Sequence, residues 1–198
     1  IDFDFKYKCK PYQRAIGLIG ENGVGKSTLL NDIVNSFVGK DKSAFLTLPP
    51  IVSKIMVMSY SPFDKFPTAS TDFTTEYHYS GLLKNDSELY SQEEQIVTFK
   101  KNLARILERG SADHLKRKWW RIMSEVINTD IIAGFYEKDD KGVYKLAEDN
   151  INEFCQNMSS GESIYVYSLT EIIANIRYDT LLLFDEPEQH LHPHAITV

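Results

Sequence analysis

The stretch that most constrains the fold is the glycine-rich segment at residues 20–27, which has the pattern Gly-x-x-x-x-Gly-Lys-Ser. An apolar run at residues 15–19 precedes it, and apolar residues at helical spacing follow it over residues 27–37. This order predicts a strand, a loop and a helix, which is the context that a phosphate-binding loop requires. Backbone N–H groups and the helix N-terminus bind phosphate in such a loop. The residues predicted to contact a nucleotide are Gly20, Glu21, Asn22, Gly23, Val24, Gly25, Lys26, Ser27 and Thr28.

A second motif supplies carboxylates. Residues 180–184 are a continuous apolar run that predicts a strand buried on both faces of a parallel sheet, and Asp185 and Glu186 follow directly. Ligands of open α/β sheets bind at the carboxyl ends of the strands, so the two motifs are expected to meet there. By itself the acidic pair could equally begin a solvated loop. Together with the phosphate loop, it predicts an ATPase that uses ATP and Mg²⁺.

The expected roles follow from the chemistry of phosphoryl transfer. Lys26 is predicted to bridge the β- and γ-phosphates of ATP. The Ser27 hydroxyl and the Asp185 carboxylate are the predicted Mg²⁺ ligands, Asp185 through a water molecule. Glu186 is suited to orient and deprotonate the attacking water, so Glu186 and Lys26 are the predicted catalytic residues.

The remaining chain is expected to complete one α/β domain over residues 1–198, and because it opens on Ile1 rather than Met, we expect a fragment of a longer protein. Residues 1–10 alternate apolar and charged, which is typical of an antiparallel edge hairpin, and residues 51–59 predict a second core strand. Residues 63–157 change character and predict an inserted helical lobe. The predicted later helices are 91–109, 113–128 and 160–176.

Composition excludes several classes of protein. A net charge of −6 argues against a whole-surface nucleic-acid binder. The two cysteines, Cys9 and Cys155, lie far apart in the sequence without Cys/His ligand spacing, so neither a disulfide framework nor a zinc site is indicated. No apolar run approaches the roughly 18 residues that a membrane span needs. A cytoplasmic protein outside the membrane is the expectation.

A third motif lies upstream of the acidic pair, at Met158, Ser159, Ser160, Gly161 and Glu162. By itself it reads as a plain helix N-cap. It also resembles the signature segment of ABC ATPases, Leu-Ser-Gly-Gly-Gln in its commonest form, with matches at Ser159 and Gly161. The resemblance implies a P-loop NTPase fold of the ABC type, with a mixed sheet, an antiparallel subdomain and a helical insertion. It also implies a head-to-tail homodimer, in which Ser159, Ser160, Gly161 and Glu162 cap the ATP bound to the other subunit.

The last motif of the sequence indicates which ABC ATPases the chain resembles most. Residues 185–193 read Asp-Glu-Pro-Glu-x-x-Leu-His-Pro, which is similar to the OLD-like and SMC-like soluble ABC ATPases. Among these, the short lobe and the Ser-Pro-Phe-Asp turn at residues 61–64 look most like the Septu (PtuA) ATPases of antiphage defence, also found beside retrons. That resemblance implies an HNH-type nuclease partner of the PtuB kind, regulated by the ATPase. The family's γ-phosphate switch histidine is expected beyond Val198.

Two other functions stay open. A DNA-repair or chromosome-maintenance ATPase of the RecF or Rad50 type would need long coiled coils, and no sustained heptads occur. A transporter subunit would need a glutamine after the second core strand, where this chain has Tyr60 and Ser61. Ser61 or Asp64 could substitute for that glutamine, or the turn could be purely structural.

Three side-chain groups keep two interpretations each. His190, His192 and His194 are either a metal site or part of a dimer interface. Tyr7 and Tyr12 either stack on adenine or pack in the fold. Residues 114–121 mix four cations with Trp119 and Trp120, and either contact nucleic acid or bury their tryptophans beneath a solvated cationic face.

Overall fold

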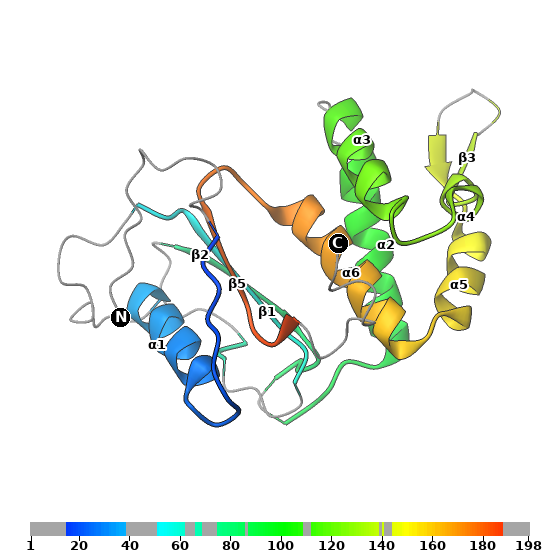
Figure 1. The fold of residues 1–198 in the computed structure, drawn as a ribbon. Helices are drawn as coiled ribbons and strands as arrows, with labels where there is room; N and C mark the ends of the chain where they lie inside the picture. The colour runs from blue at the N-terminus through cyan, green and yellow to red at the C-terminus, as the bar shows by residue number, and fades with distance from the viewer. Residues whose placement is uncertain are drawn as a thin grey trace.

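The computed structural model describes residues 15–38, 51–61, 66–68, 75–85, 87–108, 112–138, 140 and 144–187. The described part of the chain begins with one helix and two strands, helices dominate its middle, and a helix and a strand end it (Figure 1). In chain order the elements are α1 (Lys26–Val38), β1 (Lys54–Ser59), β2 (Glu76–Gly81), α2 (Gln92–Glu108), α3 (Ala112–Met123), α4 (Thr129–Ala133), β3 (Tyr136–Lys138), β4 (Tyr144–Leu146), α5 (Glu148–Asn157), α6 (Ser160–Asn175) and β5 (Thr180–Phe184).

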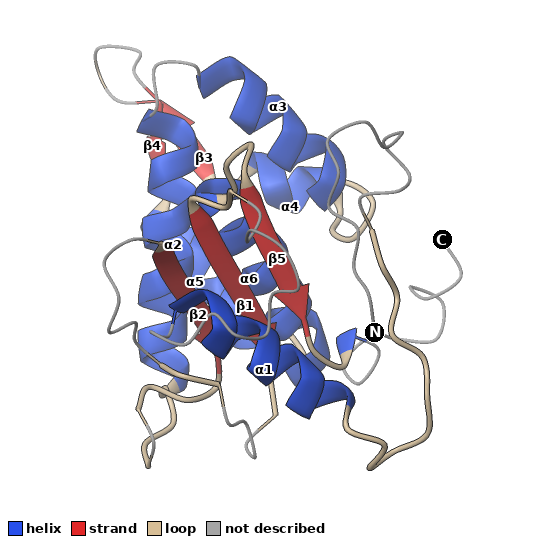
Figure 2. Cartoon of the chain, turned by 90° about the vertical axis from the view of Figure 1, so that its left-hand side faces the viewer, coloured by secondary structure: helices blue, strands red, loops and turns tan. Residues whose placement is uncertain are grey.

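A parallel sheet of three strands, in the order β2-β1-β5, organises the described residues. The central strand β1 is buried along its whole length. Ile55 and Val57 face α1, whereas Met56 and Met58 face α6. The sheet therefore lies between helices on its two faces, as a parallel sheet requires (Figure 2). The predicted strands at 51–59 and 180–184 are confirmed as β1 and β5.

Helix α1 packs on the sheet because its apolar residues recur every three to four positions. Leu30, Val34 and Phe37 are buried in one cluster with Ile55 and Val57 of β1. Leu183 of β5 belongs to the same cluster. The helix predicted from residues 27–37 is confirmed and begins one residue earlier, at Lys26.

The helices of the middle segment share a second core with α6. Its largest side chains are fully buried, and Trp119 and Phe135 lie at its centre with ring centroids 6.3 Å apart. The helix predicted at 91–109 is confirmed as α2. The helix predicted at 113–128 is α3, which ends five residues earlier than predicted, at Met123. A separate short helix, α4, begins beyond the predicted range, and Asn128 caps it by accepting a 2.8 Å hydrogen bond from the Asp130 N–H.

Three findings differ from the sequence analysis. The apolar run at 15–19 lies outside every described strand; no described strand pairs with it, and Ile19 is fully exposed. β5 is an outer strand of the described sheet, so its faces are only partly buried and Phe184 is 36% exposed. β2 lies within the range predicted for the helical lobe but pairs with β1, so the helical segment begins at α2.

Antiparallel pairing among the described residues is confined to β3–β4 and a single bridge between Leu83 and Leu89. The antiparallel hairpin predicted at residues 1–10 lies outside the described part of the chain. None of the described helices is both long and apolar enough to cross a membrane.

Candidate nucleotide-binding site

The glycine-rich loop has a backbone that other residue types would strain. Gly23 has φ of 82° and Gly25 has φ of 94°, values in the left-handed region that glycine adopts without steric cost. A Cβ atom at Gly20 would lie 2.9 Å from Cγ2 of Val24, an exposed side chain that would have to move aside. The backbone of the loop therefore explains the glycines at positions 23 and 25.

Lys26 closes this loop from the first residue of α1. Its Nζ donates hydrogen bonds to the carbonyl oxygens of Gly20 at 2.8 Å and Glu21 at 3.0 Å. The helix continues with the Leu29 N–H donating to the Gly25 carbonyl at 2.9 Å. Ser27 and Thr28 are exposed in the first turn, where backbone N–H groups have no intrahelical acceptor. The loop and helix start thus present a cation, hydroxyls and N–H donors to solvent.

The acidic pair follows the carboxyl end of β5. Asp185 is only 7% exposed, and its N–H donates a 2.9 Å hydrogen bond to the carbonyl of Met58, which prolongs the pairing of β5 with β1. Glu186 is half-buried and has φ of 49°, the one positive φ of a non-glycine residue in the described part of the chain. An L-residue held in this region is strained, and such residues concentrate at functional sites.

The two predicted motifs share one end of the sheet. All three strands are parallel, and the first turn of α1 lies on the side toward which their carboxyl ends point (Figures 1 and 2). Open α/β sheets bind ligands at this end. The fold therefore places Lys26 and Ser27 on the same side of the molecule as Asp185 and Glu186.

The third motif forms a complete capping box at the start of α6. The Ser159 Oγ accepts from the Glu162 N–H at 3.3 Å, and the Ser159 N–H donates to Glu162 Oε2 at 2.9 Å. The hydrogen bond from the Ser159 hydroxyl, together with that from its N–H, lowers the pKa of Glu162. The predicted N-cap is confirmed. Ser159 and Ser160 are exposed, so this helix N-terminus is accessible.

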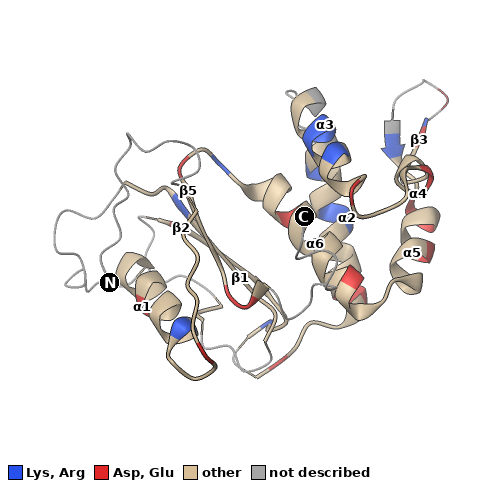
Figure 3. Ribbon diagram, viewed as in Figure 1, with Lys and Arg blue, Asp and Glu red and all other residues tan. Residues whose placement is uncertain are grey.

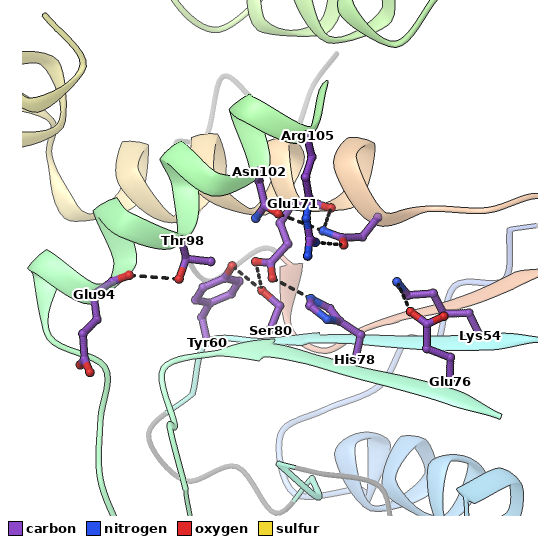
Figure 4. A network of polar contacts seen from close by, with 11 residues as sticks. Lys54, Tyr60, Glu76, His78, Ser80, Glu94, Thr98, Asn102, Arg105 and Glu171 are labelled. Atoms are coloured by element: carbon purple, nitrogen blue, oxygen red, sulfur yellow. Dashed lines mark hydrogen bonds and ion pairs between the residues drawn. The ribbon is translucent and has the colours of Figure 1, made fainter. Parts of the chain in front are cut away.

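A buried polar network joins the sheet to α6 (Figure 4). Glu171 of α6 accepts a hydrogen bond from the Ser80 hydroxyl at 2.5 Å, and its other carboxylate oxygen lies 2.7 Å from Nε2 of His78. The Tyr60 hydroxyl, just beyond β1, lies 3.3 Å from Ser80 Oγ. Burial, and then the nearby Glu171 carboxylate, raise the pKa of Tyr60 to about 12.

The network continues from α6 into the helical segment. Asn175 donates to Asn102 Oδ1 at 3.2 Å and accepts from the Arg105 guanidinium at 2.8 Å, both on α2. On α3, the Trp119 indole N–H donates to the Thr170 hydroxyl at 2.9 Å. Sequence reasoning missed these contacts. The one available signal was the alternation of polar His78 and Ser80, which places both on one face of a strand.

The other candidate residues divide between described and undescribed segments. Trp119 is fully buried, so it does not stack on bases, and Trp120 packs against the helical core. Ser61 is described, whereas Asp64 lies outside the described residues. Cys155 is a free buried thiol whose pKa is raised by burial. Also outside the described residues are Tyr7, Tyr12, His190, His192 and His194. Within the described ranges, no three His, Cys, Asp or Glu side chains gather as metal ligands.

Comparisons with known proteins give one distant relative. The chain is 26% identical to protein ea59 of Escherichia phage lambda over 228 aligned positions, which cover 98% of this chain and 43% of that protein. The chain thus spans less than half the length of that relative. No protein-family model matches the sequence, and no solved structure matches it.

Proposed function

We propose that this chain binds ATP with Mg²⁺ and hydrolyses it. The observation that carries the proposal is the loop at residues 20–27, in which Gly23 and Gly25 adopt positive φ and Lys26 reaches across the loop from the start of α1. A γ-phosphate entering the loop would replace the carbonyl oxygens of Gly20 and Glu21 as acceptor for the Lys26 ammonium. The exchange offers the cation a stronger, charged acceptor.

The carboxylates at the end of β5 complete the proposed site. Ser27 and Asp185 would hold Mg²⁺, and Glu186 would orient and deprotonate the attacking water. The strained backbone of Glu186 supports a role in the chemistry, because its positive φ turns the side chain away from the path of an ordinary strand end. Asp185, tied through its N–H to β1, supplies a fixed carboxylate beside it.

A homodimer with two ATP molecules in its interface is part of the proposal. Ser159, Ser160, Gly161 and Glu162 would contact the nucleotide of the other subunit, and the exposed N-terminus of α6 is suited to bind a phosphate. Such a dimer would be a cytoplasmic ABC-type ATPase that regulates a nuclease partner of the HNH type in antiphage defence. The longest described helix, α2, has 17 residues, which favours this class over ATPases with long coiled-coil arms.

The first experiment measures binding of ATP·Mg²⁺ by calorimetry and phosphate release by a coupled assay. Lys26→Ala should weaken binding about 10- to 150-fold, since a charge-assisted hydrogen bond contributes about 1.5–3 kcal/mol. Glu186→Gln should keep ATP bound and lower the hydrolysis rate at least about 100-fold. Lys101→Ala, an exposed lysine on α2, is the control and should leave both unchanged. Unaltered ATP affinity of Lys26→Ala would refute the proposed phosphate loop.

The second experiment tests the composite site by complementation. Lys26→Ala removes the loop of one chain, and Gly161→Asp places a carboxylate in the α6 turn. Each variant alone should be inactive. An equal mixture should recover about a quarter of the parental activity, since half of the dimers are mixed and each mixed dimer has one complete site. A mixture that stays inactive, although Glu186→Gln forms an ATP-dependent dimer, would contradict the assignment of the α6 turn.

A further inference from the structure

One exposed side of helix α2 carries an apolar residue between two opposite charges. Glu93, Val97 and Lys101 follow one another at intervals of four residues, so they lie on one side of the helix and span about 12 Å of its axis. All three are exposed, whereas Phe99 and Leu103, on the other side of α2, are buried in the helical core. We call Glu93, Val97 and Lys101 the α2 stripe.

The two charges of the stripe are not paired within the part of the chain that the structure describes. Neither Glu93 nor Lys101 forms an ion pair there, although the adjacent Glu94 and Lys100 form ion pairs at 2.6 and 2.7 Å. No residue three or four positions from Glu93 is basic, and none three or four positions from Lys101 is acidic. Acidic residues therefore occupy the first turn of α2 and basic residues its second half (Figure 3).

We infer that the α2 stripe is an interface between two copies of this chain, whose α2 helices pack antiparallel about a twofold axis at Val97. Residues four positions before and four after Val97 lie level across such an axis, because each is about 6 Å from it along the helix. Glu93 of each copy then faces Lys101 of the other, and the two Val97 side chains pack together. A twofold interface repeats every contact, so both ion pairs form at once.

The distribution of charge favours a second copy over other partners. A parallel pairing of the two stripes would set Glu93 against Glu93 and Lys101 against Lys101, and like charges repel each other. A uniformly anionic partner, such as a membrane surface or a nucleic acid, would be repelled by Glu93. The apolar area extends beyond Val97, since Leu89 and Tyr90 are 56% and 37% exposed just before the helix.

The size of the contact indicates a weak and reversible association. Helix α2 has 17 residues, and a contact between two such helices is of the class that buries less than about 1,200 Å². None of the residues in the stripe belongs to the proposed nucleotide site. The association is therefore expected without nucleotide and does not rest on the proposed ATPase function.

The test measures the mass of the full chain without nucleotide by sedimentation velocity, over about 5–200 μM protein at low salt. The parent should pass from monomer toward dimer over this range. Glu93→Lys and Lys101→Glu each set like charges against each other at two places, so each should weaken dimerisation about tenfold or more. An equal mixture of these two variants should dimerise with nearly the parental affinity, because a mixed pair joins opposite charges at both contacts.

Matched controls change the same charges elsewhere. Glu125→Lys and Arg121→Glu alter exposed residues outside α2, and each should change the dimerisation constant less than about twofold. Near-ultraviolet circular dichroism establishes that every variant is folded.

Three results would overturn the inference. They are a parent that stays monomeric at the highest concentration, dimerisation that persists unchanged in both single variants of the stripe, and a mixture that stays monomeric although the parent dimerises. Because no nucleotide is present, failure of the proposed ATP site would not change any of these outcomes.

Discussion

The backbone strain at Glu186 predicts an unusual order of stability among its substitutions. A left-handed φ of 49° costs a residue with a Cβ atom about 1–2 kcal/mol and costs glycine almost nothing. Glycine gains more entropy than alanine in the unfolded chain, which offsets about 0.4–1 kcal/mol of that difference. At the midpoints of these two ranges, Glu186→Gly should be about 0.8 kcal/mol more stable than Glu186→Ala. Both variants lose the whole carboxylate, so any contact of that side chain cancels in the comparison.

Urea denaturation measures the difference, and Glu125 provides the control. Glu125 is exposed in the turn after α3 and does not have positive φ, so Glu125→Ala should be the more stable of its pair by about 0.4–1 kcal/mol. Hydrolysis should be lost equally in Glu186→Ala and Glu186→Gly, which separates backbone strain from catalysis. If alanine is as stable as glycine at position 186, the positive φ does not persist in solution and the reasoning fails.

Three further predictions concern Tyr60, Trp119 and Ser159. Because burial raises the pKa of Tyr60 to about 12 from 10.0, the free energy of unfolding of the parent should fall as pH rises from 10 to 12. Tyr60→Phe should lack that fall, which urea titrations at each pH measure and which is on the order of 3 kcal/mol at most. Parallel pH profiles would contradict this. Trp119→Phe should lower the free energy of unfolding by about 2–4 kcal/mol, because it removes the hydrogen bond to Thr170 and leaves a cavity. A decrease below about 1 kcal/mol would be inconsistent with full burial of the indole. Ser159→Ala should lower the free energy of unfolding by about 1 kcal/mol and should raise the pKa of Glu162 in an NMR titration. Because folding lowers the pKa of Glu162 in the parent, this carboxylate stabilises the fold at pH values above its unfolded pKa, and the contribution is lost as the pH falls through the folded pKa.

The spacing of apolar residues predicted the helix that buries one side and the strand that is apolar along its whole length. The apolar spacing in α1 and the unbroken run in β5 are visible in sequence, and both elements lie where the patterns indicate. The run at 15–19 misled because apolar residues give strand propensity but not a pairing partner. β2 was missed for the opposite reason. Its sequence has no aliphatic run and ends at Gly81, so only the register with β1 makes it a strand.

Some features of the candidate site were likewise predictable from the sequence, and others were not. The loop at 20–27 and the acidic pair were predicted because their spacing along the chain is the motif itself. The environment of Glu171 arises from tertiary contacts that no spacing encodes, and the φ of Glu186 is likewise visible only in the folded chain. Glu171 would ordinarily mark the solvent side of a helix. It is buried because α6 has no solvent side at this point, with the sheet on one flank and the helical segment on the other.

This double burial of α6 ties the two halves of the described structure together. From the sheet, Ser80 and His78 bind Glu171; from α2 and α3, Asn102, Arg105 and Trp119 bind residues within one turn of it. A helix is stiff along its axis, and buried hydrogen bonds to a carboxylate cost about 1.5–3 kcal/mol each to break. The turn at Ser159 therefore cannot shift far without moving the sheet or the helical segment. If that turn contacts ATP across a dimer, a shift of α6 on binding would also move the helical segment that packs on it.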